Sequence, residues 1–435
     1  MDKASTHIMG RGLDYTQIYD EVVQAGSLDS SPFSESSLEV TDPPLVKIAT
    51  TDSEKRKIYA VRYKAYITEM NGEKRHPEAD NTSQEFHDDW DDTAYHFYVE
   101  RDGVIGACMR VNLRRDGPLE CEEQLGIELF KPAFPGHVGL TSRLVLRPDF
   151  RQRNLLTQMS RAMYQFNTEQ GIHYSFLDCH PKLLPLYSRL GYRLYNPGFN
   201  HKKYTYVIPM VLVMNDVCHL DQVRSPLATL ARRLAYSSSR PVAVTWDRPQ
   251  SCKTEDTMVI TAPHESADTG LAGSPHRVSD AELFEDLMPE EVTTLVSLGH
   301  IISCRAGDSV LNPGDPGREI FVILNGSFQV QRRTIGANTA QVKVLKILSA
   351  GETFGEIRFL KDELRHASVK AREDSTLLIL NAKALDRLVT TAPRIAAKVF
   401  RNIARIITVR LCDGVRFIRM PKTRAQKAVV NGCEL

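Results

Sequence analysis

Several features are scarce in this 435-residue sequence, and each scarcity argues against a class of protein. The formal net charge is only +1, so bulk electrostatic binding to nucleic acid or to an anionic membrane is not expected. No apolar run approaches the ~18 residues of a membrane span, and the first residues lack the apolar core of a signal peptide. The eight cysteines are scattered without a Cys-x-x-Cys pair, which favours a reducing cytoplasm over a zinc site or a disulfide framework.

The length exceeds that of one ordinary hydrophobic core, so the chain is expected to form two domains joined by a linker. Shifts in composition place the boundaries, because Ser-, Pro- and Thr-rich stretches are typical of tails and linkers. The predicted parts are a mobile tail (1–44), a first domain (45–218), a helix and linker (219–278), a second domain (279–412) and a loose basic tail (413–435). Within the third part, residues 219–236 are expected to form one helix.

The first domain alternates helical and strand-like patterns, which predicts a mixed α/β fold. Its helices are expected over 53–70, 154–169 and 182–190, and the last of these is ended by Gly191. Its strands are expected over 95–100, 104–112, 139–146, 174–179 and 204–214.

The second domain begins with a predicted helix over 281–299 and continues with short strands separated by glycines. Regular strands with glycine turns predict a small β-barrel or jelly roll. Residues 382–411 then carry apolar side chains at helical spacing, which indicates one amphipathic helix.

The most distinctive stretch is 351–371, which reads GETFGEIRFLKDELRHASVKA. A Gly355 turn before a helix start exposes backbone N–H groups to an anion, and Arg365 supplies a planar fork suited to a phosphate. The Phe-Gly-Glu run, the arginine nine residues after Glu356 and the Ala-Ser-Val run at 367–369 resemble the phosphate-binding cassette of cyclic nucleotide-binding domains. The resemblance covers about residues 279–412 and implies a cupin-like barrel followed by helices that relay ligand occupancy.

The resemblance implies that Arg365 holds the cyclic phosphate, Glu356 the ribose 2′-hydroxyl and the Gly355 backbone the phosphate oxygens, with Ser368 near the purine. The implied site also includes Ile357, Arg358, His366 and Ala367. Arg358 stands where the family usually has alanine, so its side chain either crowds the ligand or adds a phosphate contact. The effector is cAMP or cGMP, and the alternative is a barrel that binds no nucleotide. The tail after residue 411 is too short for a helix-turn-helix, which argues against a transcription factor.

Two stretches of the first domain, 140–153 and 180–192, resemble the GNAT acyltransferase superfamily. The resemblance implies that N–H groups near Leu144, Val145 and Leu146 contact a thioester, and that Tyr187 protonates the thiolate leaving group. The following helix start, with Arg151, Arg153 and Asn154, would hold the phosphate of the donor. Both small positions of the usual pyrophosphate loop are absent there, which suits an acyl carrier protein better than coenzyme A.

A third stretch, 88–97, adds four aspartates around one tryptophan directly before a strand. Together with the first helix and two further strands, it resembles autoinducer synthases and, still more, N-acyl amino acid synthases. The residues that carry this resemblance are Arg62, Tyr66, Asp88, Trp90, Asp91, Arg110, Ser142 and Arg143. Autoinducer synthases usually have glutamate where this chain has Leu140, so an amino acid or similar small amine is the expected acceptor.

For the reaction, we expect the amine to attack the thioester after losing a proton to Asp91 or to a water held by Asp88 or Asp91. Arg143 and Arg110 would orient carboxylates or the loop. The alternative is that Arg62, Asp91 and Arg143 form a buried ion network that touches no substrate. No metal is expected.

The resulting hypothesis is a cytoplasmic N-acyltransferase of the GNAT superfamily that moves a long acyl chain from acyl carrier protein or acyl-CoA to an amine, regulated by a cyclic nucleotide. Two alternatives stay open: a cAMP-regulated protein lysine acetyltransferase using acetyl-CoA, and a sensor with a degenerate acyltransferase domain. Expected partners are acyl carrier protein, a small amine, the nucleotide and a second copy joined through the C-terminal helices.

Overall fold

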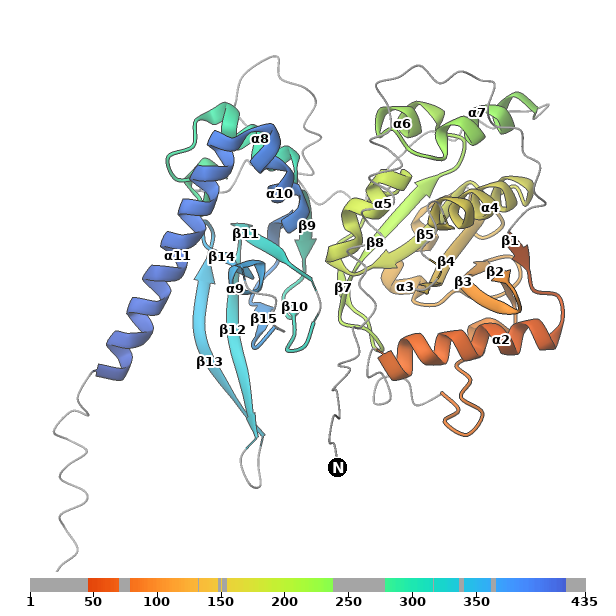
Figure 1. The fold of residues 1–435 in the computed structure, drawn as a ribbon, viewed down its shortest axis with the longest axis horizontal. Helices are drawn as coiled ribbons and strands as arrows, with labels where there is room; N and C mark the ends of the chain where they lie inside the picture. Colours follow the sequence, from red (N-terminus) through yellow and green to blue (C-terminus); the bar gives the residue numbers. More distant parts are fainter. Residues whose placement is uncertain are drawn as a thin grey trace, which may run out of the picture. The chain divides into compact units, whose positions relative to one another are not determined.

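The structure is a computed structural model that describes residues 46–69, 79–131, 133–147, 150, 155–237, 278–315, 317–335, 340–360 and 365–419. They form two compact units, the first built mainly on residues 46–237 and the second on most of 278–419 (Figure 1). The predicted N-terminal tail, most of the predicted linker and the end of the basic tail lie outside the described residues.

The first unit contains one mixed sheet in the order β1-β2-β3-β4-β5-β8-β6, with β7 paired to β8. The strands are β1 (Val46–Ile48), β2 (Ala94–Arg101), β3 (Val104–Leu113), β4 (Val138–Leu146), β5 (Tyr174–Cys179), β6 (Arg193–Leu194), β7 (Phe199–Asn200) and β8 (Tyr206–Val213). Strands β4 and β5 are parallel, and the other pairs are antiparallel. The predicted mixed α/β fold is confirmed.

Short helices surround this sheet. They are α2 (Asp52–Tyr63), η1 (Lys64–Glu69), η2 (Asp89–Asp91), α3 (Glu122–Leu125), η3 (Ile127–Leu129), α4 (Leu155–Glu169), η5 (Pro181–Leu183), α5 (Leu184–Leu190), α6 (Val217–Gln222) and α7 (Ala228–Ser237). A capping box between Thr51 and Glu54 begins α2. Gly191, at a φ of 108°, ends α5 as predicted. The single helix expected over 219–236 is instead two, because the chain turns at Arg224, whose φ is 51°.

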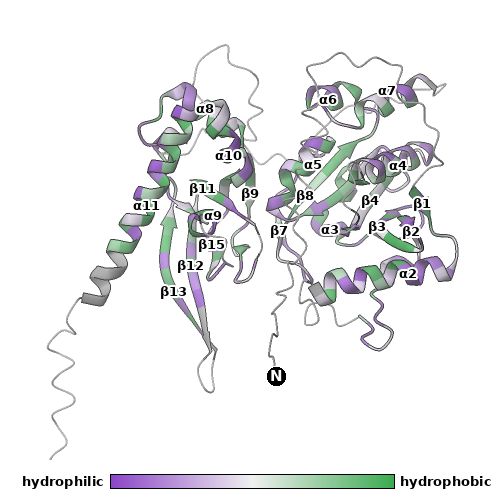
Figure 2. Cartoon of the chain, viewed as in Figure 1, coloured by the Kyte–Doolittle hydropathy of each residue, from purple (hydrophilic) through white to green (hydrophobic). Residues whose placement is uncertain are grey.

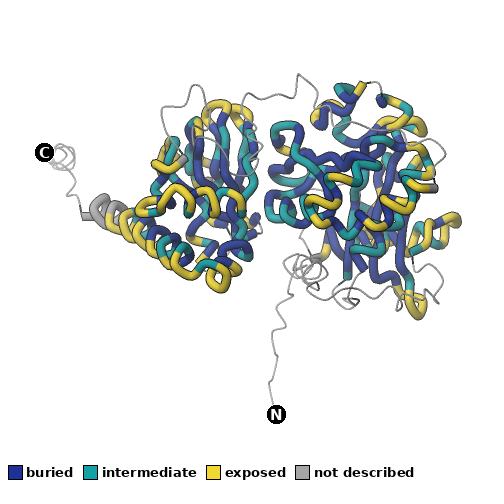
Figure 3. The backbone as a smooth tube through the Cα atoms, turned by 90° about the horizontal axis from the view of Figure 1, so that it is seen from above, coloured by how far each residue is buried: buried dark blue, intermediate teal, exposed yellow. Residues whose placement is uncertain are grey.

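The two faces of the sheet are covered differently. Helix α4 packs on one face, where the rings of Phe97 and Phe166 are 5.4 Å apart between centroids. On the other face, one apolar cluster lies under α2 and includes Ile58 and Val145, and a second lies under α3 and η3 and includes Phe176. Most of the sheet is buried, as the dark blue strands of Figure 3 show.

Strands β4 and β5 separate after a short ladder. Their pairing joins residues 138–140 to residues 174–176 and then stops, although β4 continues to Leu146. Strand β5 stays paired with β8 through Cys179. The second half of β4 therefore lies beyond the β4–β5 ladder, on the edge that the GNAT resemblance assigns to the thioester.

The second unit contains two four-stranded sheets, in the orders β10-β15-β12-β13 and β14-β11-β16-β9. The strands are β9 (His300–Cys304), β10 (Ser309–Leu311), β11 (Glu319–Asn325), β12 (Ser327–Ile335), β13 (Ala340–Ser349), β14 (Thr353–Phe354), β15 (Ser368–Ala371) and β16 (Ser375–Asn381). The helices are η7 (Val278–Asp280), η8 (Glu282–Phe284), α8 (Pro289–Ser297), α9 (Glu356–Leu360), α10 (Ala382–Thr391) and α11 (Pro393–Arg419). The predicted β-rich barrel with helices is confirmed.

Prolines divide the helices that the sequence pattern had joined. The helix expected over 281–299 is two elements, η8 and α8, because Pro289 starts α8 and lacks the N–H that would continue a preceding helix. The helix expected over 382–411 likewise divides before Pro393. Helix α11 then runs to Arg419, so the start of the predicted loose tail is helical.

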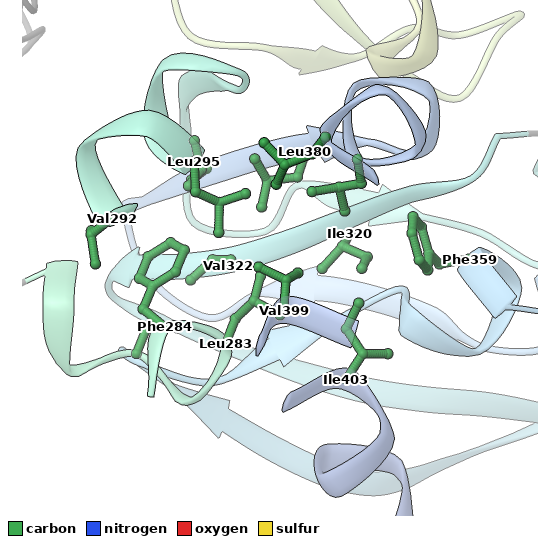
Figure 4. Packing of buried hydrophobic residues seen from close by; sticks show 14 of the residues in the cluster. Leu283, Phe284, Val292, Leu295, Ile320, Val322, Phe359, Leu380, Val399 and Ile403 are labelled. Carbon is green, nitrogen blue, oxygen red and sulfur yellow. The ribbon is translucent and has the colours of Figure 1, made fainter. Parts of the chain in front are cut away.

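The core of the second unit lies between the β11–β16 sheet and the helices. Figure 4 shows Leu283 and Phe284 of η8 packed with Val399 and Ile403 of α11 beside Ile320 of β11. The coloured part of helix α11 in Figure 2 carries both green, hydrophobic and purple, hydrophilic segments, which suits a helix with one buried side.

Candidate functional sites

A cluster of charged side chains lies on the face of the sheet that α2, α3 and η3 cover. It brings together Arg62 of α2, Asp88 before η2, Asp91 of η2, Arg110 of β3 and Arg143 of β4, and each of these is at most 8% exposed. Asp91 Oδ1 accepts hydrogen bonds from Arg62 at 2.7 Å and from Arg110 at 3.3 Å. The five charged residues that were predicted from separate stretches are therefore one buried group.

Asp88 links this group to the backbone of its own loop. Its two carboxylate oxygens accept from Arg110 and Arg143, each at 2.5 Å. Oxygen Oδ1 also accepts from the Trp90 N–H, while Asp91 Oδ2 accepts from the Asp88 N–H at 2.9 Å. This reciprocal capping forms η2 and holds both carboxylates toward the arginines.

Four further members of the cluster were not predicted from the sequence. Glu120 accepts from Arg110 at 2.6 Å and from Arg143 at 3.1 Å. The Arg143 guanidinium donates to the Tyr204 hydroxyl. His96 Nδ1 lies 3.1 Å from Arg62, and Lys203 Nζ lies 3.5 Å from Asp88. His96 falls inside the predicted stretch 88–97, but no local pattern marks Glu120, Lys203 or Tyr204.

Arg143 reaches the cluster from an unusual backbone position. Its φ is 54°, in the left-handed region, where the β3–β4 register shifts between Cys108 and Arg110. A residue other than glycine there costs about 1–3 kcal/mol. The ion pairs of Arg143, together with the rings of Phe86 and Tyr204 at 5.6 and 5.4 Å from its guanidinium carbon, offset that cost.

The predicted donor-binding residues are only partly described. Leu144, Val145 and Leu146 lie on β4 beyond the last residue paired to β5. Tyr187 lies on α5, with its ring centroid 5.7 Å from that of Tyr192. Arg151, Arg153 and Asn154 lie outside the described residues.

The second unit has a site around Gly355, between β14 and α9. Gly355 has a φ of 91°, and an added Cβ would lie 2.7 Å from the Glu319 backbone oxygen, so only glycine fits without a shift. The buried Arg365 guanidinium donates to the backbone oxygens of Gly355 at 2.8 Å and Glu319 at 3.0 Å. Its Nε has no hydrogen-bond partner within the described residues.

Helix α11 enters this site through Arg410. One Arg410 nitrogen lies 2.7 Å from the Glu356 carboxylate, and another donates to Glu282 and to the Thr353 backbone oxygen, both at 2.8 Å. Helix α9 also contacts α11 through Phe359 and Phe400, whose ring centroids are 5.9 Å apart. Glu356, which is expected to bind the ribose, is thus paired with α11 through Arg410.

The remaining predicted residues surround this pair. Ile357 is 60% exposed and His366 is exposed, whereas Arg358, Ala367 and Ser368 are partly buried. Ser368 begins β15 and faces Gln331 across the ladder to β12.

Comparison with known families assigns both regions. Residues 57–216 match the family described as N-acyl amino acid synthase FeeM, and residues 301–392 match the cyclic nucleotide-binding domain family. The chain joins an N-acyl amino acid synthase domain to a cyclic nucleotide-binding domain. Both resemblances drawn from the sequence are confirmed, and the charged cluster lies within the synthase domain.

Two relatives that resemble part of this chain are named for cyclic nucleotides. The cyclic AMP receptor protein of Thermus thermophilus is 31% identical over 141 residues, which is 32% of this chain and 59% of the relative. The cGMP-dependent protein kinase egl-4 of Caenorhabditis briggsae is 32% identical over 104 residues, which is 24% of this chain and 13% of the kinase. The chain therefore spans less than two thirds of either relative.

Among solved structures that are similar to part of this chain is the catabolite activator protein of Thermus thermophilus. It is 29% identical with a TM-score of 0.29, and the match covers 32% of this chain and 62% of that chain. A cyclic nucleotide-binding domain from Methylobacillus flagellatus is 25% identical with a TM-score of 0.30, covering 34% of this chain and 82% of that chain.

In the charged cluster of the synthase domain, the neighbouring arginines favour the ionised form of the carboxylates. Burial by itself would raise the pKa of Asp91, but Arg62 and Arg110 outweigh it and hold that pKa below the usual range. The same balance, with Arg143 as the leading cation, lowers the pKa values of Asp88 and Glu120. A carboxylate with a lowered pKa is a weak proton acceptor. These contacts match the ion network that the sequence left as the alternative to catalysis by Asp88 or Asp91.

Burial is also the main cause that lowers the pKa of Arg365 in the nucleotide-binding domain. Glu319 opposes this effect, and the positive charge of Arg358 adds to it. Two cations therefore stand close together beside the Gly355 turn.

In the described part of the chain, no helix has the length and apolar character needed to cross a membrane. Among the same residues, no group of three His, Cys, Asp or Glu side chains is placed to hold a metal ion.

Proposed function

We propose that the protein is an N-acyltransferase, regulated by a cyclic nucleotide, that moves an acyl chain from acyl carrier protein to the amine of an amino acid. The match of residues 57–216 to N-acyl amino acid synthases carries this proposal. The separation of β4 from β5 after Leu140 and Phe176 supports it, because the second half of β4 then has an edge that β5 does not occupy.

In the proposed reaction the acceptor amine attacks the thioester carbonyl and forms a C–N bond. Backbone N–H groups near Leu144, Val145 and Leu146 that point away from β3 stabilise the oxyanion. The C–S bond then breaks, and Tyr187 gives a proton to the departing thiolate. Arg151, Arg153 and Asn154 hold the phosphate of the prosthetic group. The acyl length is long in this proposal, which separates it from an acetyltransferase.

The buried ion network positions the parts of this site. Arg62, Arg110 and Arg143 hold η2 against β3 and β4 through Asp88 and Asp91. Because both aspartates are paired and their pKa values are lowered, we assign them a positioning role and not that of the proton acceptor. Loss of Asp91 strands the buried Arg62 guanidinium, which is costly, whereas loss of Asp88 leaves Arg110 and Arg143 paired with Glu120.

The second domain is proposed to bind cAMP or cGMP. Within the described residues the buried Arg365 Nε has no hydrogen-bond partner, and Arg358 adds a second positive charge, so an anion would complete the site. The ribose hydroxyl of the ligand would compete with Arg410 for Glu356. Because α9 and α11 are joined by this pair and by Phe359 and Phe400, we propose that ligand binding releases α11 and so regulates the synthase domain.

One experiment tests acyl transfer. The purified full-length protein is incubated with octanoyl-, dodecanoyl- and hexadecanoyl-acyl carrier protein and an equimolar mixture of the proteinogenic amino acids, and the products are identified by mass spectrometry. An N-acyl amino acid is the expected product. Stabilisation by acetyl-CoA together with acetylation of protein lysines, and no N-acyl amino acid, would favour the acetyltransferase instead.

A second experiment tests nucleotide binding and regulation. Saturating cAMP or cGMP is expected to raise the melting temperature of the second unit by several degrees and to change the acylation rate. Arg365→Ala should abolish the shift, whereas Arg372→Ala, at an exposed position beside β15, should keep it. A shift that survives Arg365→Ala would contradict the assigned phosphate site. An acylation rate that neither nucleotide changes would contradict regulation.

A further inference from the structure

Asp178 is an acid of the synthase domain that lies outside the sequence stretches singled out above. It lies on β5, two residues after Phe176, the last β5 residue paired to β4. Side chains alternate along a strand, so Asp178 faces the same side as Tyr174 and Phe176, which lie in the apolar cluster under α3 and η3. On its other edge it pairs with Pro209 of β8. Asp178 therefore stands where β4 and β5 separate, on the face of the charged cluster.

The carboxylate of Asp178 differs from the other acids of the cluster in its contacts. Asp88, Asp91 and Glu120 are each within 4.0 Å of at least two cationic side chains. Within the described residues, no ion pair or hydrogen bond joins Asp178 to another side chain. The side chain is partly buried, so it keeps some access to solvent. A partly buried carboxylate without a cation is a place where a ligand cation fits.

The charges that face Asp178 come from three elements. Glu120 and Cys121 precede α3, Arg110 lies on β3, and Arg143 lies on β4. Burial raises the pKa of Asp178 to about 6, Glu120 adds to the rise, and Arg143 and then Arg110 partly oppose it. Burial also raises the pKa of the Cys121 thiol to about 12, so that thiol stays neutral. Of the acids in the cluster, Asp178 is the one that titrates near neutral pH.

We propose that the Asp178 carboxylate binds the ammonium group of the acceptor and takes its proton as the amine attacks the thioester. This role rests on the proposed function. The ammonium loses one proton to Asp178, the nitrogen forms a bond to the carbonyl carbon, and the C–S bond breaks. The nitrogen loses a second proton, so one proton goes to the thiolate and one to solvent by way of Asp178. The raised pKa suits this work, because an acceptor titrating near the working pH transfers protons best.

The test compares Asp178→Asn with the wild-type chain, using the acyl carrier protein and amino acid that the product screen identifies. Asp178→Asn should lower kcat/KM roughly 100-fold or more at neutral pH. In the wild-type chain, kcat/KM should fall as the pH drops below about 6, and this limb should be absent in Asp178→Asn. Asp178→Glu should recover part of the activity. Asp221→Asn, the same change at an exposed residue of α6, is the matched control and should leave the rate unchanged.

A second acceptor separates proton transfer from folding. The α-hydrazino analogue of the amino acid is less basic than the α-amine, so at pH 8 a much larger share of it is already neutral and it depends less on a proton acceptor before attack. Asp178→Asn should therefore lose much less activity with the hydrazino acceptor than with the amino acid. An equal loss with both acceptors, or an unchanged pH limb with the amino acid, would overturn the assignment. If the wild-type chain itself gives no N-acyl product, the proposed function has failed and not the role of Asp178.

Discussion

The pairing of Arg62 with Asp91 allows a direct test of whether Asp91 is structural or catalytic. The two side chains are 1% and 3% exposed, and the nitrogen and oxygen that join them are 2.7 Å apart. Asp91→Asn keeps the size of the side chain but removes its charge. Arg62 then faces a neutral amide, and Arg110 loses one of the three carboxylates that it contacts.

The cost follows from the burial of the pair. Breaking a buried ion pair by removing one partner destabilises a protein by about 3–5 kcal/mol. For a domain of this size each kcal/mol corresponds to a shift of about 2–4 °C, so the melting temperature should fall by roughly 6–20 °C. Adding Arg62→Met removes the stranded charge, and the double variant should recover part of this loss.

Differential scanning calorimetry of the full-length chain measures this change. The two units should give separate transitions, and the transition that cyclic nucleotide shifts belongs to the second unit and serves as an internal control. We expect Asp91→Asn to lower the melting temperature of the first unit, and turnover should fall in proportion to the fraction of that unit that is unfolded. A melting temperature within about 2 °C of wild type, together with a 100-fold loss of turnover in folded protein, would show that Asp91 acts in the chemistry.

Three further predictions concern pH and the nucleotide site. Burial lowers the pKa of His96 from 6.5 to about 4, so the unfolded chain binds a proton at this residue before the folded chain does. The free energy of unfolding should therefore fall by up to ~3 kcal/mol as the pH drops from 6.5 to 4. Urea midpoints measured over this pH range should show the decrease, and His96→Gln should remove it. Arg410→Ala frees Glu356 and should tighten binding of cAMP or cGMP several-fold by titration calorimetry; weaker or unchanged binding would mean that the pair does not compete with the ligand. Gly355→Ala should lower the stability of the second unit by about 1–3 kcal/mol in urea unfolding, because its φ is 91° and the new Cβ meets the Glu319 backbone; no loss would contradict this reading.

Local patterns were sufficient for most elements of the fold. The strand predicted over 174–179 is β5 residue for residue, and the end of α5 at Gly191 is as expected. Alternation, capping and glycine turns act over a few neighbouring residues, so they can be read without the tertiary structure. The misjudged helices, over 219–236, 281–299 and 382–411, share one cause: apolar spacing continued across a turn or a proline that ended the hydrogen-bonded helix.

The sequence by itself determined the two domains and the residue types of both sites, because Glu356, Arg365 and the Asp88–Phe97 stretch are recognisable from spacing and neighbours. Only the tertiary structure decided how those charges are used. Arg62 and Asp91 are 29 positions apart and Arg143 and Asp88 are 55 apart, yet each pair is in contact. The pKa of a carboxylate depends on burial and on the distance to such charges. Asp91, which is paired with arginines, and Asp178, which has no ion pair within the described residues, therefore could not be told apart along the chain.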